Sequence, residues 1–192
     1  MKNSKLLYEL DAYQKKYFKK DYLLSSNLNS EHGNVFAYGS TPYITFQQLI
    51  NNFTIKPKRF VVVGCSIGWV NFYWNDLFPE VPTKGIDLHN FRILFGKDLI
   101  DKYELKNIEL SIEDFYDFDF NDGDLIWQSN LCFPTDKLNE VNSSIINDLN
   151  NFGIISYKPL SSCKNIDVDN IKTNVLKTSW SDRQSFFTYE KL

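Results

Sequence analysis

The sequence predicts an α/β domain in three layers, in which a mostly parallel sheet of seven strands lies between two layers of helices. From residue 60 onward, short apolar runs alternate with helical stretches, which is typical of parallel strands joined by right-handed crossovers. The alternation stops near residue 170, because the strand-like runs 171–178 and 184–190 follow each other with no helix between them. We therefore expect an antiparallel hairpin at one edge of the sheet.

The individual elements follow from the same periodicities. The strands expected before the hairpin are 59–64, 83–88, 107–112, 124–130 and 152–157, and the helices between them are 68–78, 90–103 and 135–150. A further helix is expected over 41–50, with Thr41 as its cap and Pro42 at its first position. Helical spacing over 4–20 makes 1–35 a separate helix and loop, either a lid or a helix packed on the sheet, before a main domain over 36–192.

Composition limits the functions that the chain can have. The 192 residues are 43% hydrophobic and 23% charged, which fits a single globular domain. Its net charge is −3 and its densest basic group is two lysine pairs in 15–20, so strong binding to nucleic acid is disfavoured. No apolar stretch is long enough to span a membrane. The three cysteines, Cys65, Cys132 and Cys163, fit neither a disulfide framework nor a metal site, and we expect a cytoplasmic setting.

The stretch FVVVGCSIGWV, residues 60–70, indicates where a ligand binds. Ligands of parallel α/β sheets lie beyond the carboxyl ends of the strands, and glycines there let the backbone approach a ligand closely. Gly64 and Gly68 stand directly after the first strand, with Ser66 between them. The helix that follows offers free N–H groups at its start.

Acidic and aromatic residues follow the next strands. Asp87 comes 23 residues after Gly64, the spacing at which dinucleotide-binding folds place an acid that accepts hydrogen bonds from both ribose hydroxyls. Asp114 follows the third strand, where it could pair with an adenine amino group, and Phe115 could stack on the ring. The fourth strand ends in SNLCFP. Each residue alone is weak evidence, and their placement at the same sheet edge carries the prediction.

In the order of these motifs the chain resembles the class I S-adenosylmethionine-dependent methyltransferases, which have a Rossmann-like fold. More narrowly, it is similar to the non-SET histone lysine methyltransferases related to the disruptor of telomeric silencing. The Tyr-Gly-Glu-Thr segment of that family matches 38–41, with Ser40 for the acid, and its glycine loop matches 62–68 without an acid at Val62. The ribose acid of the family falls on Asp87 and its Asp-Phe pair on 114–115.

The resemblance covers about residues 36–190 and extends to the methyl-transfer site. The Asn-Asn-Phe-x-Phe loop of the family aligns with 129–133, its Ser-Lys-Pro-Phe stretch with 157–160, and its closing Ser-Trp and Ser-Tyr-Tyr with 179–180 and 185–187. The implied S-adenosylmethionine ligands are Tyr38, Thr41, Gly64, Ser66, Gly68, Asp87, Leu88, Asp114, Phe115 and Ser129. The implied catalytic residues are Ser129, Asn130, Phe133 and Phe186.

The favoured reaction is methyl transfer to a protein lysine. Such a lysine must lose its proton, and an apolar channel lowers its pKa by desolvation. The rings of Phe133, Trp180 and Phe186 could form this channel, while Asn130 or Ser129 could orient the acceptor nitrogen. Two other functions stay open, namely methylation of a small amine or an RNA by the same fold, and a cofactor-binding module without turnover.

Overall fold

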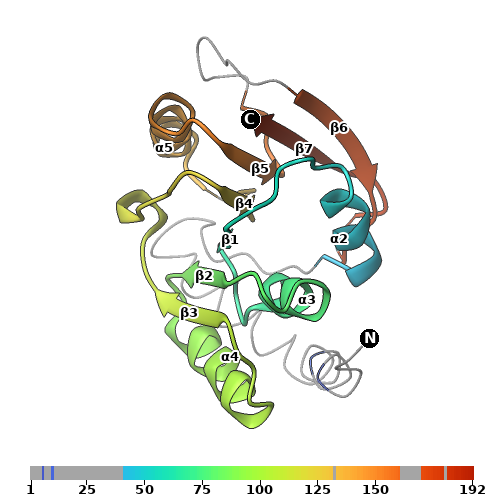
Figure 1. Ribbon diagram of the computed structural model, residues 1–192, viewed down its shortest axis with the longest axis vertical. Coiled ribbons are helices and arrows are strands. Elements are labelled where there is room, and N and C mark those ends of the chain that lie inside the picture. The colour runs from blue at the N-terminus through green and yellow to red at the C-terminus, as the bar shows by residue number, and fades with distance from the viewer. Residues whose placement is uncertain (1–5, 7–9, 11–40, 132, 161–169, 180) are drawn as a thin grey trace.

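The structure is a computed structural model, and it describes residues 6, 10, 41–131, 133–160, 170–179 and 181–192. Within this part of the chain, seven strands form one sheet in the order β3-β2-β1-β4-β5-β7-β6 (Figure 1). The strands are β1 (Arg59–Val63), β2 (Thr83–Asp87), β3 (Ile108–Ile112), β4 (Asp124–Gln128), β5 (Phe152–Ser156), β6 (Asn170–Leu176) and β7 (Gln184–Lys191). The helices are α2 (Tyr43–Ile50), α3 (Trp69–Leu77), α4 (Asn90–Lys102), α5 (Thr135–Asp148) and the short 3₁₀ helix η2 (Phe115–Asp117).

Parallel pairing brings the ends of five strands to one edge of the sheet. β1 pairs in parallel with both β2 and β4, so that Val62 lies between Gly85 and Trp127. β3 extends this arrangement on one side and β5 on the other, again in parallel. β7 is antiparallel to β5 and to β6, and Asn174 is paired with Phe186 in the hairpin. The predicted α/β fold, with a C-terminal antiparallel hairpin, is therefore confirmed.

Helices cover both faces of the sheet. Figure 1 shows α5 on one face and α2, α3 and α4 on the other. Side chains of β1 alternate between the two hydrophobic clusters under these helices: Val61 and Val63 pack on the α5 side, and Phe60 and Val62 pack on the α3 side. A sheet that is apolar on both faces explains the uninterrupted FVVV run. Val62, at the position of an acid in the resembling family, is fully buried.

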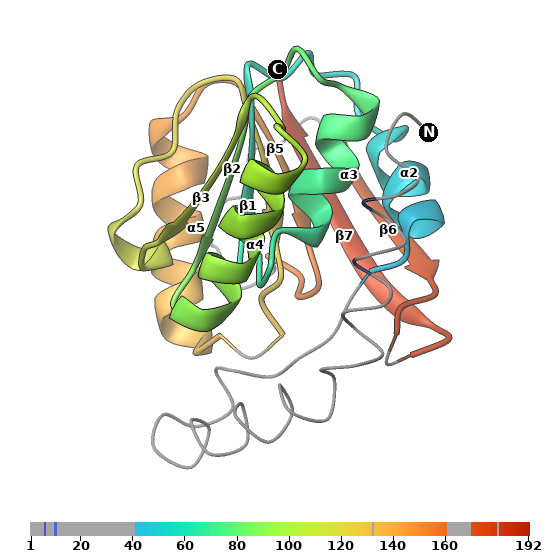
Figure 2. The same cartoon turned by 90° about the horizontal axis from the view of Figure 1, so that it is seen from below.

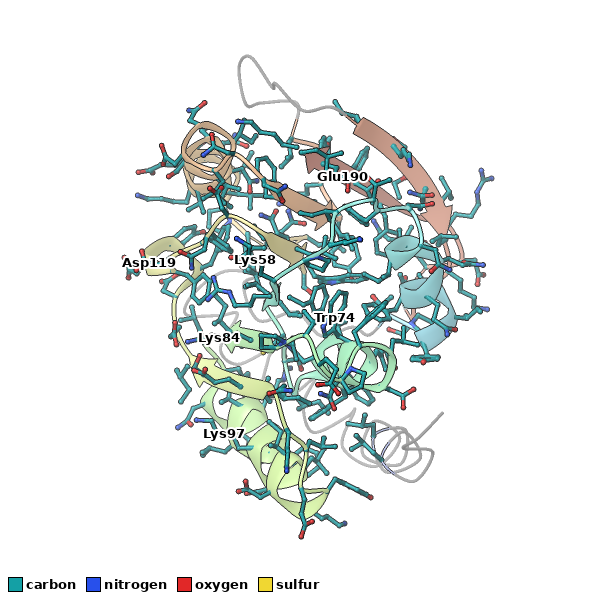
Figure 3. The ribbon with its side chains drawn as sticks, in the orientation of Figure 1. Lys58, Trp74, Lys84, Lys97, Asp119 and Glu190 are labelled. Atoms are coloured by element: carbon teal, nitrogen blue, oxygen red, sulfur yellow. The ribbon has the colours of Figure 1, made fainter. Side chains whose placement is uncertain are left out.

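The helix that follows β1 is held in place by an aromatic stack. Trp74 belongs to α3 (Figure 3). Its ring lies against that of Phe60 of β1, with centroids 4.3 Å apart and an interplanar angle of 14°. Its indole N–H also donates a 3.1 Å hydrogen bond to the carbonyl of Val81. These contacts fix α3 against the sheet and hence fix the loop from which α3 begins.

A buried carboxylate joins the segment before β1 to the hairpin. Glu190 lies on β7 (Figure 3) and is 3% exposed. It accepts hydrogen bonds of 2.8 Å from the main-chain N–H of Thr54 and 2.9 Å from its hydroxyl, and a further one from the N–H of Ile55. Because Ile55 is buried and its N–H would otherwise have no partner there, Glu190 stabilises the entry into β1.

The start of α2 differs from the prediction. The helix begins at Tyr43 with Pro42 as its N-cap, and no side chain caps it. The Thr41 hydroxyl is instead 2.7 Å from the hydroxyl of Tyr157, with which it shares a hydrogen bond. Thr41 as the cap and Pro42 as the first helical residue were therefore wrong, because a distant tertiary partner engages the side chain that local sequence assigned to capping.

Two residues of the predicted helix over 4–20 are described. Leu6 and Leu10 are helical, 2% and 0% exposed, and belong to the same hydrophobic cluster as Phe46 and Trp69. The remainder of 1–35, and with it the choice between a lid and a packed helix, lies outside the described residues. Among the helices that are described, none has the length and apolar character needed to cross a membrane.

Candidate functional site at the carboxyl edge of the sheet

The candidate site lies where β1 to β5 end. Figure 2 shows these five strands side by side, with the two strands of the hairpin beside them. Because β1 to β5 are parallel, the segments that follow them all leave from one edge of the sheet. Apart from Thr41, every predicted cofactor residue that the structure describes lies at that edge.

The loop after β1 turns sharply through left-handed backbone conformations. Gly64 has φ of 70°, Ser66 of 55° and Gly68 of 91°. The main-chain N–H groups of Gly64 and Cys65 donate to the carbonyl of Ile86 at 2.9 and 3.1 Å, which holds the start of the loop against the end of β2. Ser66 thus adopts the conformation that glycine adopts without cost, and its β-carbon costs about 1–2 kcal/mol there.

Asp87 connects this loop to the end of β2. Its Oδ2 accepts a 2.8 Å hydrogen bond from the main-chain N–H of Ser66, and its Oδ1 accepts one of 2.9 Å from the N–H of His89. A carboxylate has about four acceptor positions, so each oxygen keeps one for a ligand. The side chain is partly exposed at the edge of the sheet. Asp87 can therefore accept hydrogen bonds from two neighbouring hydroxyls while it holds the loop.

Cys65, between Gly64 and Ser66, has a structural role. Its side chain is 3% exposed. Burial raises the pKa of the Cys65 thiol well above its ordinary value, and the negative charge of Asp87 adds to the effect. The thiol therefore stays protonated and is a poor nucleophile.

The segment after β3 presents an acid and an apolar surface. Oδ1 of Asp114 accepts a 3.1 Å hydrogen bond from the N–H of Tyr116 and so caps η2. Phe115 is 5% exposed and lies against Phe133, with ring centroids 5.7 Å apart. Exposed apolar side chains near the two acids include Leu88, at 46%, Tyr116, at 36%, and Ile112, at 49%, which is paired with Asp87 across β2 and β3. A flat ring bound between the ends of β2 and β3 would therefore meet Leu88 and Tyr116 before Phe115.

The segment after β4 lies directly against the glycine loop. A β-carbon placed on Gly64 would be 3.2 Å from Cβ of Ser129 and 3.5 Å from the ring of Phe133. The main-chain N–H of Ser129 donates to the carbonyl of Val63 at 2.9 Å. Lys158 holds the far side of this segment, since its Nζ donates to the carbonyl of Phe133 at 2.8 Å. The structure thus brings Ser129 and Phe133 to the predicted cofactor loop.

Asn130 lies below this surface. It is fully buried, and its Nδ2 donates to Oγ of Ser156 at 2.8 Å and to Oε1 of Gln128 at 3.2 Å. Its Oδ1 accepts from the main-chain N–H of Tyr157 at 3.1 Å. Both ends of the amide are engaged within the protein. Asn130 therefore joins the ends of β4 and β5, and its predicted role in orienting an acceptor nitrogen stays a prediction.

Phe186 is likewise part of the core. It is 0% exposed and packs between Tyr157 and Trp127, with ring centroids 4.9 and 6.0 Å away. Two other predicted residues, Tyr38 and Trp180, lie outside the described residues. Among the site residues that the structure describes, the ring of Phe133 is half-buried beside the loop after β1. The ring of Phe186 is buried in the core instead.

Sequence reasoning missed Tyr157 as a site residue. Its hydroxyl, at the end of β5, meets Thr41 at 2.7 Å from a position 116 residues away in the chain. Burial raises the pKa of Tyr157 to about 12, and the hydrogen bond with Thr41 opposes this shift. The signal in the sequence was a tyrosine directly after the predicted strand residues FGIIS. In the described part of the chain, no group of three or more acidic, histidine or cysteine side chains could hold a metal ion.

Comparison with known proteins places the fold. No protein-family model matches the chain, and no curated protein matches it in sequence. Its structure is similar to that of TrmN from Thermus thermophilus, with a TM-score of 0.62 and 15% identity over 78% of this chain and 49% of TrmN. A SAM-dependent methyltransferase from Aquifex aeolicus gives a TM-score of 0.53 and 15% identity over 76% of this chain and 88% of that one.

TrmK of M. capricolum, in complex with the natural cofactor product S-adenosyl-homocysteine, is also similar, with a TM-score of 0.54 and 12% identity over 76% of this chain and 66% of TrmK. The chain spans about half the length of TrmN. At sequence identities of 12–15%, the similarity between this chain and these proteins is a similarity of fold alone.

Proposed function

We propose that this chain, which has the fold of the class I methyltransferases, binds S-adenosylmethionine at the carboxyl edge of its sheet and transfers the methyl group to a nitrogen atom. The observation that carries the proposal is the hydrogen bond between the N–H of Ser66 and the carboxylate of Asp87. It joins a left-handed loop, able to approach a ligand with its backbone, to an acid suited to a ribose. Such a pair is the nucleotide-binding arrangement of parallel α/β folds.

The adenosine half of the cofactor would lie across the ends of β1, β2 and β3. Asp87 would accept hydrogen bonds from the ribose hydroxyls, and Asp114 would accept one from the adenine amino group. Leu88 and Tyr116 offer the exposed apolar surface on which the base could rest, and this surface supports the proposal beside the predicted role of Phe115. The backbone of Gly64 would approach the sugar and the sulfur chain, whereas the absence of a β-carbon at Gly68 makes room for Leu110, which would stand 2.9 Å from such an atom.

The methionine half would lie toward β4 and β5. Ser129 abuts Gly64, and the hydroxyl of Thr41 is held near the end of β5 by Tyr157. Both hydroxyls are suited to the carboxylate and ammonium groups of an amino acid. Tyr38, which the resemblance adds to this end, lies outside the described residues.

Methyl transfer needs positioning more than acid or base chemistry. The lone pair of the acceptor nitrogen attacks the methyl carbon while the bond from that carbon to sulfur breaks, and sulfur leaves as a neutral thioether. The positive charge passes to the nitrogen, which then releases a proton to water. Holding the nitrogen about 3 Å from the methyl carbon, in line with sulfur, supplies most of the rate enhancement.

We propose a protein lysine as the acceptor and a cytoplasmic setting. The half-buried ring of Phe133 beside the loop supports an acceptor that is desolvated before reaction. Neutral side chains dominate this end of the site, and Lys158 is occupied with the carbonyl of Phe133. The same features suit a small amine, and the net charge of −3 argues against an RNA acceptor. A cofactor-binding module without turnover remains the third alternative.

The acceptor can be identified by labelling. The protein is incubated with cofactor carrying a labelled methyl group and with a cell lysate, and the lysate is then separated into protein, RNA and small-molecule fractions. We expect label in protein, on lysine after hydrolysis, and none with the Asp87→Ala variant. Label confined to RNA or to small amines would identify that class of molecule as the acceptor instead of protein. Binding of the cofactor without any label transfer would indicate a cofactor-binding module without turnover.

A further inference from the structure

The side chain of Lys158 joins the segment after β5 to the segment after β4. Its Nζ donates a 2.8 Å hydrogen bond to the main-chain carbonyl of Phe133. The bond is charge-assisted and partly buried, so it is stronger than a hydrogen bond between neutral groups. The ring of Phe133 lies 3.5 Å from the position that a β-carbon on Gly64 would take, beside the proposed cofactor loop. Lys158 therefore holds the main chain of the residue whose ring borders that loop.

The main chain of Lys158 is itself fixed by the hydroxyl of Ser156. Oγ of Ser156 donates to the carbonyl of Lys158 at 2.6 Å and accepts from its N–H at 3.2 Å. The same oxygen accepts a 2.8 Å hydrogen bond from Nδ2 of Asn130. A hydroxyl has one donor and two acceptor positions, and all three are occupied here. Pro159 follows Lys158 and restricts it further, since a residue before proline favours extended backbone. The Lys158 side chain therefore starts from a fixed position.

Buried amides anchor this arrangement in the sheet. Oδ1 of Asn130 accepts from the N–H of Tyr157 at 3.1 Å, and its Nδ2 also donates to Oε1 of Gln128 at 3.2 Å. Nε2 of Gln128 in turn donates a 2.6 Å hydrogen bond to Oδ1 of Asn142 in α5. All three amides are 0% exposed, and each of their nitrogen and oxygen atoms except Nδ2 of Asn142 has a partner among the described residues. A buried network of this kind is rigid, so Lys158 connects a rigid base to the segment after β4.

We infer that Lys158 is a positioning residue, whose ammonium group fixes Phe133 and thereby the apolar wall that the acceptor nitrogen meets beside the cofactor. This inference rests on the proposed function and assigns a residue to it. Methyl transfer requires the nitrogen in line with the bond from methyl carbon to sulfur, and a displacement of about 1 Å can lower the rate about a hundredfold. The position of the wall therefore affects the rate of transfer, whereas the adenosine half of the cofactor lies elsewhere in the site. Lys158 acts through Phe133 and is not itself catalytic.

The Lys158→Met variant removes the ammonium group and keeps a long unbranched side chain. Two quantities are compared with those of the unaltered protein. The first is the dissociation constant for S-adenosylhomocysteine, measured by calorimetry. The second is the initial rate at which label from saturating S-adenosylmethionine enters the protein fraction of a cell lysate. We expect the affinity to change less than about twofold and the rate to fall about tenfold, as for loss of one hydrogen bond from a charged group. Equal losses of affinity and rate would mean a merely structural role and would overturn the inference, as would an unchanged rate.

The effect of Lys158 should depend on the ring of Phe133. In a Phe133→Ala background, Lys158→Met should lower the rate no further, because the ring that Lys158 positions is already absent. Two residues that act independently would instead lower the rate by the product of their separate effects. Such a product would show that Lys158 does not act through Phe133, and would contradict the inference.

Lys191→Met is the matched control. Nζ of Lys191 also donates to main-chain carbonyls, those of Ile146 and Leu149 at 3.1 and 3.0 Å, near the carboxyl end of α5, whereas the segment after β4 leads into its amino end. It should leave affinity and rate unchanged. If Lys158→Met does not fold, Ser156→Ala, which frees the main chain of Lys158, should give the same selective loss of rate. A selective loss in Lys191→Met, or none in Ser156→Ala, contradicts the inference. If the unaltered protein binds no S-adenosylhomocysteine or transfers no label, the proposed function fails, and the inference fails with it.

Discussion

The main-chain N–H of Ser66 donates a 2.8 Å hydrogen bond to the carboxylate of Asp87, and this contact organises the proposed cofactor site. It connects residues 21 positions apart in the chain, one in the loop after β1 and the other at the end of β2. The loop is thereby shaped by the same acid that would hold the ribose, so that folding and ligand binding depend on one side chain.

Replacing Asp87 should therefore strongly weaken cofactor binding. Asp87→Ala removes a charged acceptor from two ribose hydroxyls and from the N–H of Ser66, and hydrogen bonds to charged groups contribute about 1.5–3 kcal/mol each. We expect the dissociation constant for S-adenosylhomocysteine, measured by calorimetry, to rise at least about tenfold to a hundredfold. Asp98→Ala, at an exposed position of α4, is the matched control and should bind normally. An Asp87→Ala variant of unchanged affinity would refute the ribose assignment.

Ser66 should be replaceable by glycine with a gain in stability. Its φ of 55° costs about 1–2 kcal/mol for a residue with a β-carbon, and its buried hydroxyl has no partner among the described residues. We expect Ser66→Gly to raise the free energy of unfolding in urea by about 1 kcal/mol after the entropic cost of glycine is subtracted. Ser143→Gly, within α5, should lower the free energy of unfolding by about 0.5–1 kcal/mol. If both variants are less stable, Ser66 is not strained.

The protein should lose stability in alkali partly through Tyr157. Its folded pKa is raised to about 12 by burial, against an unfolded value of 10.0. Below pH 10 both states are protonated and stability is constant; above it, the unfolded chain loses a proton that the folded protein keeps, so stability falls until pH 12. At pH 11 this contributes a loss of about 1 kcal/mol. The free energy of unfolding of Tyr157→Phe should fall less between pH 9 and pH 11 than that of the unaltered protein, and an identical fall would show that the phenol ionises normally when folded.

Removing the charge of Glu190 should destabilise the fold. Glu190→Gln keeps the size of the side chain and one oxygen for the N–H groups of Thr54 and Ile55, but turns the acceptor of the Thr54 hydroxyl into a donor. We expect the free energy of unfolding to fall by about 1–2 kcal/mol, since the two N–H bonds at Oε1 would change from bonds to a charged acceptor into weaker bonds to a neutral one. Glu140→Gln is the control, because its ion pair with Lys137 is 71% exposed on the glutamate side and contributes about 0–1 kcal/mol. Equal effects of the two changes would mean that the bonds to Glu190 are not structural.

The fold was predictable because its signals are local. The apolar runs at β1 and β5 are buried on both faces and carry their signal within five residues each. The same holds for the loop after β1 and for Asp87, since their positions relative to strand ends fix which edge they occupy. Ser66 stands where the usual glycine-loop pattern has a glycine, and it adopts a left-handed backbone conformation as Gly64 and Gly68 do.

The hydrogen-bond partners of polar side chains could not be predicted from the sequence where those partners are distant in the chain. Thr41 was assigned to a helix cap because its near neighbours suit that role, whereas its hydroxyl meets Tyr157 from 116 residues away. Asn130 was assigned to an acceptor by resemblance, and the structure engages its amide with Ser156 and Tyr157. Whether a strand-end amide faces a ligand or a neighbouring strand depends on pairs of residues that only the sheet order brings together.

The most direct test of the account is calorimetric titration of the unaltered protein with S-adenosylhomocysteine. Because burial of apolar surface gives a negative heat-capacity change, titration at two temperatures avoids a chance zero of the binding enthalpy. We predict one-to-one binding with a dissociation constant on the order of micromolar, corresponding to about −8 kcal/mol. No saturable heat at either temperature, with ligand up to about 1 mM, would contradict the proposal that this sheet edge is a cofactor site.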